Sequence, residues 1–173
     1  DPANAAYDYL AKDETLDITV TYKVTDDNGA SDTNSFIITL TGTNDAPVAT
    51  FTTAQDATEG SSSISGQLTS TDVDLLGTTA TYALDGAPIA GLTINTDGSW
   101  SFDPADAAYD YLAKDQTLEI TVNYSVTDNN DASATNSFTI TLTGTNDAPV
   151  ATFTTAQDAT EGGSSITGQL TST

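Results

Sequence analysis

Residues 117–128 read TLEITVNYSVTD, and apolar and polar side chains alternate along them. Successive side chains of an extended chain point to opposite faces, so this alternation predicts a strand with one buried face and one solvent-exposed face. Residues 138–142 (FTITL) alternate in the same way. The segment Asp128-Asn129-Asn130-Asp131 between the two stretches is typical of a turn. We therefore predict an antiparallel hairpin.

The same pattern occurs earlier in the chain, where Asp27-Asn28-Gly29 stands at the turn. Residues 1–71 align with residues 103–173 without a gap, and 60 of the 71 positions are identical. The resulting period of 102 residues is too long for a solenoid unit but has the size of one β-sandwich domain. The chain is therefore predicted to consist of tandem repeats of such a domain.

The repeat predicts three parts in the chain. Residues 1–47 form the C-terminal half of one repeat with its linker, residues 48–149 form one complete repeat with its linker, and residues 150–173 begin a third repeat. Two copies of TNDAPV, at 43–48 and 145–150, mark the junctions. Because the chain starts at Asp1, not at a methionine, we expect it to be part of a longer protein.

Within the complete repeat, the pattern predicts about seven strands in roughly 100 residues, which is the strand count of an antiparallel β-sandwich. Besides the hairpin, the predicted strands are 48–53, 63–69, 78–84, 92–95 and 99–102. Thr96-Asp97-Gly98 predicts a tight turn, and Asp103-Pro104 predicts the start of a short helical crossover over 104–111. The aromatic residues expected in the core and at its corners are Trp100, Phe102, Tyr109, Tyr111 and Tyr124.

The composition excludes several classes of function. The chain has no cysteine and no histidine, which excludes disulfides, thiolate zinc sites and nucleophiles activated by histidine. Paired carboxylates could serve a glycosidase, but an active site duplicated every 102 residues is not expected, so we predict that the protein is not an enzyme. The net charge of −22 excludes nucleic acid as a partner, and no apolar run is long enough to insert into a membrane.

Acidic residues gather at turns and near the junctions. Calcium takes six to eight oxygen ligands and mixes carboxylates with carbonyls, and an Asp-x-Asp pair on extended backbone points both carboxylates to one side. Each cluster alone is equally consistent with a solvated acidic turn. The candidate ligands are Asn44, Asp45, Asn146, Asp147, Glu59, Glu161, Asp72, Asp74, Asp128 and Asp26.

Several short motifs together resemble bacterial cadherin-like repeats, particularly the VCBS-type repeats of large RTX adhesins, and the resemblance covers the whole repeat. The motifs are STDVD at 70–74, YSVTD at 124–128, GTNDAPV at 144–150 and DATEG at 56–60. This resemblance implies an all-β, Ig-like/cadherin-like sandwich with Ca²⁺ at the junctions. It implies that the first junction uses the ligands Asn44, Asp45, Asp72, Asp74 and Asp128.

At the second junction, the resemblance implies that Glu59 joins Asn146 and Asp147, and that Glu161 and Asp26 serve junctions whose other halves lie outside the chain. The sequence departs from the cadherin pattern in three ways. The asparagine that follows the linker aspartate in cadherins is missing. Gly42 and Gly144 stand where the cadherin linker has an acidic or amide residue, and the Asp-Arg-Glu motif is missing. Asp110 and Asp115 are the candidate substitutes. We therefore expect one or two calcium ions at each junction.

By resemblance, the chain is an extender segment of a secreted bacterial surface adhesin that supports adhesion or biofilm formation outside the cell. Its partners are then the neighbouring repeats of the same chain. Two alternatives stay open. The chain could be a subunit of an extracellular filament in which identical copies exchange strands, or a carbohydrate-binding module with Trp100 as an exposed sugar platform.

Overall fold

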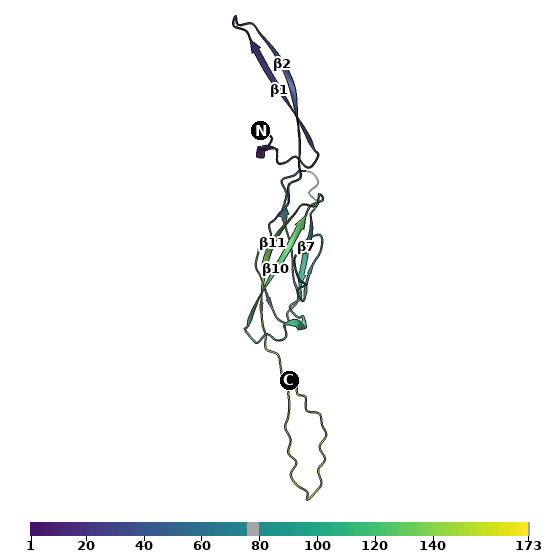
Figure 1. Cartoon of the computed structure of the whole chain (residues 1–173). Helices are drawn as coiled ribbons and strands as arrows, with labels where there is room; N and C mark the ends of the chain where they lie inside the picture. Colours follow the sequence, from purple (N-terminus) through teal and green to yellow (C-terminus); the bar gives the residue numbers. More distant parts are fainter. Residues whose placement is uncertain (76–79, 173) are drawn as a thin grey trace.

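A computed structural model of the chain describes residues 1–75 and 80–172. It is elongated and has three regions in chain order (Figure 1). A lone hairpin lies at one end, a β-sandwich lies in the middle, and residues 150–172 form an extended loop at the other end. No helix within the described residues has the length and apolar character needed to cross a membrane.

The predicted hairpin is the centre of the sandwich. It pairs β10 (Thr117–Thr127) with β11 (Ser133–Thr143) in an antiparallel register that places Val122 opposite Phe138. Two short strands complete this sheet, β7 (Thr81–Leu84) against β10 and β4 (Gln55–Thr58) against β11. The β4–β11 pair is parallel, whereas the sequence predicted only antiparallel pairing.

Two smaller sheets form the remainder of the sandwich. One has the order β5 (Ile64–Gln67), β9 (Ser99–Phe102) and β8 (Leu92–Ile94), and the other pairs β3 (Val48–Ala49) with β6 (Ser70–Thr71). Both are antiparallel. The prediction of an all-β sandwich is therefore confirmed.

The core lies between these sheets, as the alternating pattern predicts. Six inward residues of β10 and β11 are at most 2% exposed, namely Val122, Tyr124, Val126, Phe138, Ile140 and Leu142. Opposite them, Trp100 and Phe102 of β9 are 2% and 0% exposed. Phe51 packs edge-on against Phe138 with ring centroids 5.1 Å apart.

Several local predictions are wrong in detail. The predicted strand 48–53 is reduced to β3, and β4 follows beyond it in a different sheet. The predicted strand 63–69 is reduced to β5, and β6 follows beyond it, again in a different sheet. The predicted strand 78–84 starts at Thr81 within the described residues, and its positions 78–79 lie outside them.

The predicted crossover helix 104–111 is shorter than expected. It is the 3₁₀ turn η2 (Ala107–Tyr109), and its N-cap is Asp106, whose carboxylate accepts a hydrogen bond from the Ala108 N–H. Asp103 instead closes a turn onto the Ala105 N–H just upstream. Tyr111, expected in the core or at its corner, is 65% exposed because it lies beyond this turn.

The first copy of the hairpin consists of β1 (Thr15–Thr25) and β2 (Ser31–Thr41), preceded by the 3₁₀ turn η1 (Ala5–Tyr7). Its register is the same as that of β10 and β11, but no other strand pairs with it in the described chain. Residues 150–172 form only an isolated bridge between Ala151 and Ser172. Only the central repeat therefore has a complete core.

Candidate metal centre at the inter-repeat junction

The linker residue Asn44 is held by the turn between β10 and β11 of the repeat that follows it. Its side-chain N–H donates to Asp128 Oδ2 over 2.8 Å, and its Oδ1 accepts from the side chain of Asn130 over 2.6 Å. Asp128 is fixed in turn because its Oδ1 accepts the backbone N–H groups of Asn130 and Ala132. These hydrogen bonds therefore hold the linker against the sandwich without the help of a cation.

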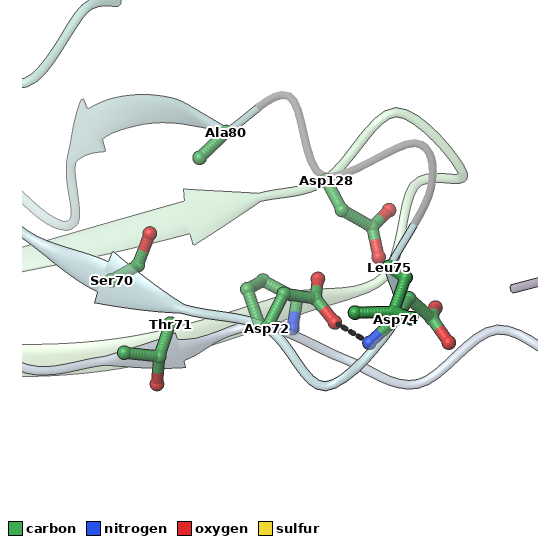
Figure 2. Close-up of a pocket in the computed structure, with 8 residues that line it drawn as sticks. Ser70, Thr71, Asp72, Asp74, Leu75, Ala80 and Asp128 are labelled. Carbon is green, nitrogen blue, oxygen red and sulfur yellow. Dashed lines mark hydrogen bonds between the residues drawn. The ribbon is translucent and has the colours of Figure 1, made fainter. Parts of the chain in front are cut away.

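The second linker residue contacts the Asp-x-Asp segment. The backbone N–H of Asp45 donates to Asp74 Oδ2 over 3.1 Å. The Asp74 N–H donates to Asp72 Oδ1 over 3.1 Å, and this bond bends the segment after β6 (Figure 2). Asp72 and Asp74 therefore lie beside the linker residue Asp45, on a bend and not on the extended strand that the sequence predicted.

The carboxylates of Asp72, Asp74 and Asp128 line one pocket of about 250 Å³ (Figure 2). Asp74 and Asp128 are 4% and 6% exposed, which is unusual for carboxylates without a cationic partner. Asp74 Oδ1 is buried and has no hydrogen-bond partner within the described chain. A buried carboxylate oxygen left unpaired is costly, and a cation is one group that would satisfy it.

The surroundings move the pKa values of the two buried carboxyls in opposite directions. Burial raises the pKa of Asp74 above its ordinary value of 3.8, and the nearby charges of Asp72, Asp45 and Asp128 raise it further against the hydrogen bond from the Asp45 N–H. Burial also disfavours ionised Asp128. There the hydrogen bonds from Asn44, Asn130 and Ala132 outweigh burial, so the pKa of Asp128 is lowered.

A second pocket, of about 210 Å³, has residues of the linker and of the preceding repeat in its lining. Asp45 lines it together with Asp8, which follows the turn η1 of the preceding repeat. Asp8 is the counterpart of Asp110 at the offset of 102 residues. Acidic residues from both repeats therefore flank the same linker.

The second junction is defined by Glu59. This residue is 6% exposed, and its Oε2 accepts the Thr145 backbone N–H over 2.7 Å, directly before the linker residues. Its Oε1 is buried and unpartnered within the described chain. Asn146 and Asp147 are exposed, and the side chain of Asn146 contacts only the Asp147 carbonyl among the described residues.

The remaining candidates lie at the surface. Glu161, Asp110 and Asp115 are exposed, and within the described residues none of their side chains hydrogen-bonds another candidate. Asp26 closes the β1–β2 turn by accepting from Asn28 and Ala30, as Asp128 does in the complete repeat. Asp26 therefore matches Asp128 in closing its turn, but it has no counterpart of the hydrogen bond from Asn44.

The residues of the first junction fit a calcium ion in chemical type. Among residues 1–75 and 80–172, no three acidic side chains converge closely enough to hold an ion by themselves. Calcium sites also use amide and carbonyl oxygens. In this structure the Asn44 Oδ1 accepts from Asn130, and the Asp45 carbonyl accepts from the Asn44 side chain. The unpartnered oxygens of Asp74 and Glu59 are the observations that fit a cation best.

Close packing explains why glycine stands at positions 42 and 144, where the cadherin linker has an acidic or amide residue. A Cβ on Gly144 would lie 2.5 Å from the Ala113 carbonyl oxygen, and Gly144 itself bonds to Gln116 and Asp115. A Cβ on Gly42 would collide with the backbone of Leu10 and Ala11 in the same way. No side chain fits at this position, so the residue cannot contribute a ligand from a side chain.

Two residues of the first junction, Asn130 and Asp8, were not predicted from the sequence. Asn130 contacts Asn44 across 86 positions, and no local pattern indicates such a pair. Asp8 could have been found from the repeat itself, because its counterpart Asp110 was a candidate at the second junction.

The fold is therefore that of a cadherin-like β-sandwich with an acidic linker site. The family described as bacterial cadherin-like domain matches residues 44–144, and the chain belongs to that family. No curated protein matches the sequence.

Solved structures with the same fold include animal cadherins. Extracellular domains 1–4 of protocadherin gamma B7 align with a TM-score of 0.55 and 15% identity, over 84% of this chain and 36% of theirs. Drosophila N-cadherin EC1–4 aligns with a TM-score of 0.52 and 15% identity, over 84% of this chain and 37% of that one. Mouse cadherin-23 EC22–24 aligns with a TM-score of 0.51 and 14% identity, over 75% of this chain and 42% of that one. The chain thus spans less than half of each.

Proposed function

We propose that the chain is an extender segment of a secreted bacterial surface adhesin of the VCBS-type RTX class, stiffened by calcium at its junctions. The observation that supports this proposal best is the docking of the linker. Asn44 and Asp45 contact Asp128 and Asp74 of the following repeat, beside a buried carboxylate oxygen that has no partner in the described chain.

The high negative charge of the chain is the reason why a bound ion would affect its stiffness. With a net charge of −22, carboxylates of successive repeats repel one another unless cations neutralise them. Asp45, Asp72, Asp74 and Asp128 would hold the ion at the first junction, with the Asn44 side chain beside them. Glu59 with Asn146 and Asp147 would hold one at the second. A bound cation would hold linker and repeat together and so restrict bending.

The proposed location follows from the expected affinity. Extracellular calcium modules bind with dissociation constants of about 10⁻⁴ to 10⁻³ M, which matches calcium outside cells and not in the cytosol. An extended series of repeats would hold an adhesive region of the parent protein away from the cell surface. The division into parts at 47/48 and 149/150, and the number of ions at each junction, remain predictions within this proposal.

Calorimetric calcium titration combined with X-ray scattering tests the proposal. We expect millimolar-range binding, and we expect EGTA to shorten the maximum dimension of the chain. Asp74→Asn and Asp128→Asn should weaken binding at the first junction. Asp56→Asn is the matched control, because Asp56 is an exposed carboxylate on β4 outside the junctions and the charge change is the same.

Two outcomes would overturn the proposal. One is a scattering profile that EGTA leaves unchanged while calcium binds. The other is an equal loss of binding in Asp74→Asn and Asp56→Asn, which would indicate diffuse attraction to the acidic surface instead of a site.

A further inference from the structure

The side chain of Asn130 contacts the linker, and it can make this contact only as an amide. Its amide group donates to Asn44 Oδ1 over 2.6 Å, while the amide nitrogen of Asn44 donates to Asp128 Oδ2. An ionised carboxylate accepts hydrogen bonds but donates none. Conversion of Asn130 to an acid would therefore remove the donor and place a negative charge against the Asn44 carbonyl oxygen, close to Asp128.

Asparagine loses its side-chain amide spontaneously when the backbone nitrogen of the next residue attacks it. That nitrogen bonds to the asparagine Cγ, the bond from Cγ to the side-chain nitrogen breaks, and ammonia leaves with the proton of the attacking N–H. Water then opens the cyclic imide to aspartate or isoaspartate, so the reaction consumes water and releases ammonia. A Cβ on the attacking residue crowds this step, and glycine has none.

The two copies of the hairpin turn differ at the residue that would attack. Gly29 follows Asn28, and Asp131 follows Asn130 at the equivalent position of the complete repeat. Both residues have left-handed backbone, with φ +89° at Gly29 and +69° at Asp131. Glycine adopts this conformation most easily. Asp131 is therefore not the residue that the backbone favours, and its carboxylate makes no hydrogen bond within the described residues.

We propose that Asn28 is a site of spontaneous deamidation and that Asp131 protects Asn130 from the same reaction. The Cβ of Asp131 hinders attack on Asn130, and the hydrogen bond to Asn44 restrains the Asn130 side chain. The complete repeat therefore combines a less favourable turn residue with a more durable contact to the linker. This inference does not depend on calcium binding or on the proposed extender role.

The surroundings of Asn28 permit the reaction. Asn28-Gly29 is the only Asn-Gly pair among the 173 residues, and Asn28 is exposed. Within the described residues its side-chain amide donates only to the neighbouring Asp27, over 3.3 Å. The Gly29 N–H donates to the Asp26 carbonyl over 3.2 Å, so the turn must open before the nitrogen attacks. Exposed turns open locally at little cost in free energy.

Peptide mapping by mass spectrometry tests the proposal on the 173-residue chain, incubated at mildly alkaline pH in EGTA. We expect aspartate and isoaspartate to accumulate at position 28 while Asn130 keeps its amide over the same period. Asp131→Gly should add deamidation of Asn130 at a rate that approaches the rate at Asn28. Gly29→Asp is the matched exchange in the first copy, and it should suppress the reaction at Asn28 without affecting Asn130.

Urea denaturation in EGTA measures the consequence for the complete repeat, followed by the fluorescence of Trp100, the only tryptophan. Asn130→Asp mimics the aspartate product and should unfold at a lower urea concentration than the parent chain. Asn28→Asp makes the same change outside the complete repeat and should leave the midpoint unchanged. Freshly prepared Asp131→Gly should be the most stable protein, and its midpoint should fall during incubation as Asn130 reacts.

Several results would overturn the proposal. They are an Asn28 that stays intact, an Asn130 that reacts as fast as Asn28 in the parent chain, and an Asn130 that stays intact in Asp131→Gly after Asn28 has reacted. A midpoint of Asn130→Asp equal to that of the parent chain would show that the amide is not needed for the linker contact.

Discussion

The side chain of Asn44 donates a hydrogen bond of 2.8 Å to Asp128, although 84 positions separate the two residues. The same Asn44 amide accepts from Asn130, so a single linker residue satisfies two groups of the β10–β11 turn. Hydrogen bonds to charged groups contribute about 1.5–3 kcal/mol each. Docking of the linker therefore stabilises the repeat that follows it.

We expect Asn44→Ala to lower the free energy of unfolding of the complete repeat by about 2 kcal/mol, because it leaves buried Asp128 without its amide donor. Urea denaturation in EGTA, followed by Trp100 fluorescence, measures the change. Asn146→Ala is the matched control, since its side chain contacts only the neighbouring Asp147 carbonyl among the described residues. Equal effects of the two substitutions would contradict the prediction.

The raised pKa of Asp74 predicts an unusual pH dependence of stability without calcium. The folded chain binds this proton more tightly than the unfolded chain, so stability rises as the pH falls through the folded pKa, and the gain is complete below 3.8. The lowered pKa of Asp128 acts in the opposite sense. Its contribution is present above 3.8 and is lost as the pH falls through its folded pKa.

Comparing Asp74→Asn with the parent chain isolates the first effect, because the other carboxyls are common to both. The stability advantage of Asp74→Asn in EGTA should be greatest at neutral pH and should shrink as the pH approaches 3.8. Urea denaturation over this pH range measures it. An advantage that does not change with pH would show that Asp74 is not held with a raised pKa.

Gly66 leaves the space that the Trp100 indole fills. A Cβ at this position would lie 2.7 Å from Trp100 Cζ2 and 2.8 Å from Nε1. We expect Gly66→Ala to destabilise the complete repeat by about 1–3 kcal/mol, because the buried indole must move. Thermal unfolding measures the loss. Gly168→Ala, at the same position of the third repeat and with no atom within 4 Å, should have no effect on the melting temperature.

Asp131 has φ +69° in the β10–β11 turn, where the first copy has Gly29 at φ +89°. Left-handed backbone disfavours residues with a Cβ, though aspartate tolerates it better than most. We expect Asp131→Gly to stabilise the repeat by about 0.5–1 kcal/mol and Asp131→Ala to destabilise it. Chemical denaturation should rank the three proteins in the order Gly, Asp, Ala. Any other order would exclude backbone strain as the cause.

The sequence predicted what depends on local pattern and on the internal repeat. The alternation at Val122 and Tyr124 identified the buried face. The acidic motifs named Asp74 and Asp128, which the structure places next to the linker residues Asp45 and Asn44, as candidate ligands. The passage from β3 to β4 was not predicted, because a change of sheet leaves no mark on a pattern with a period of two residues. The contact of Asn130 with Asn44 was missed because a hydrogen bond between distant amides has no sequence signature.

The parallel pairing of β4 with β11 determines how a repeat responds to tension. β4 lies near the entry of the chain into the repeat, and β11 ends at Thr143, directly before the outgoing linker. A force that stretches the chain moves these two neighbours past each other along their length. The four pairs from Gln55–Ile140 to Thr58–Thr143 are therefore loaded together in shear and are not opened in succession. The complete repeat thus carries a mechanical clamp between β4 and β11.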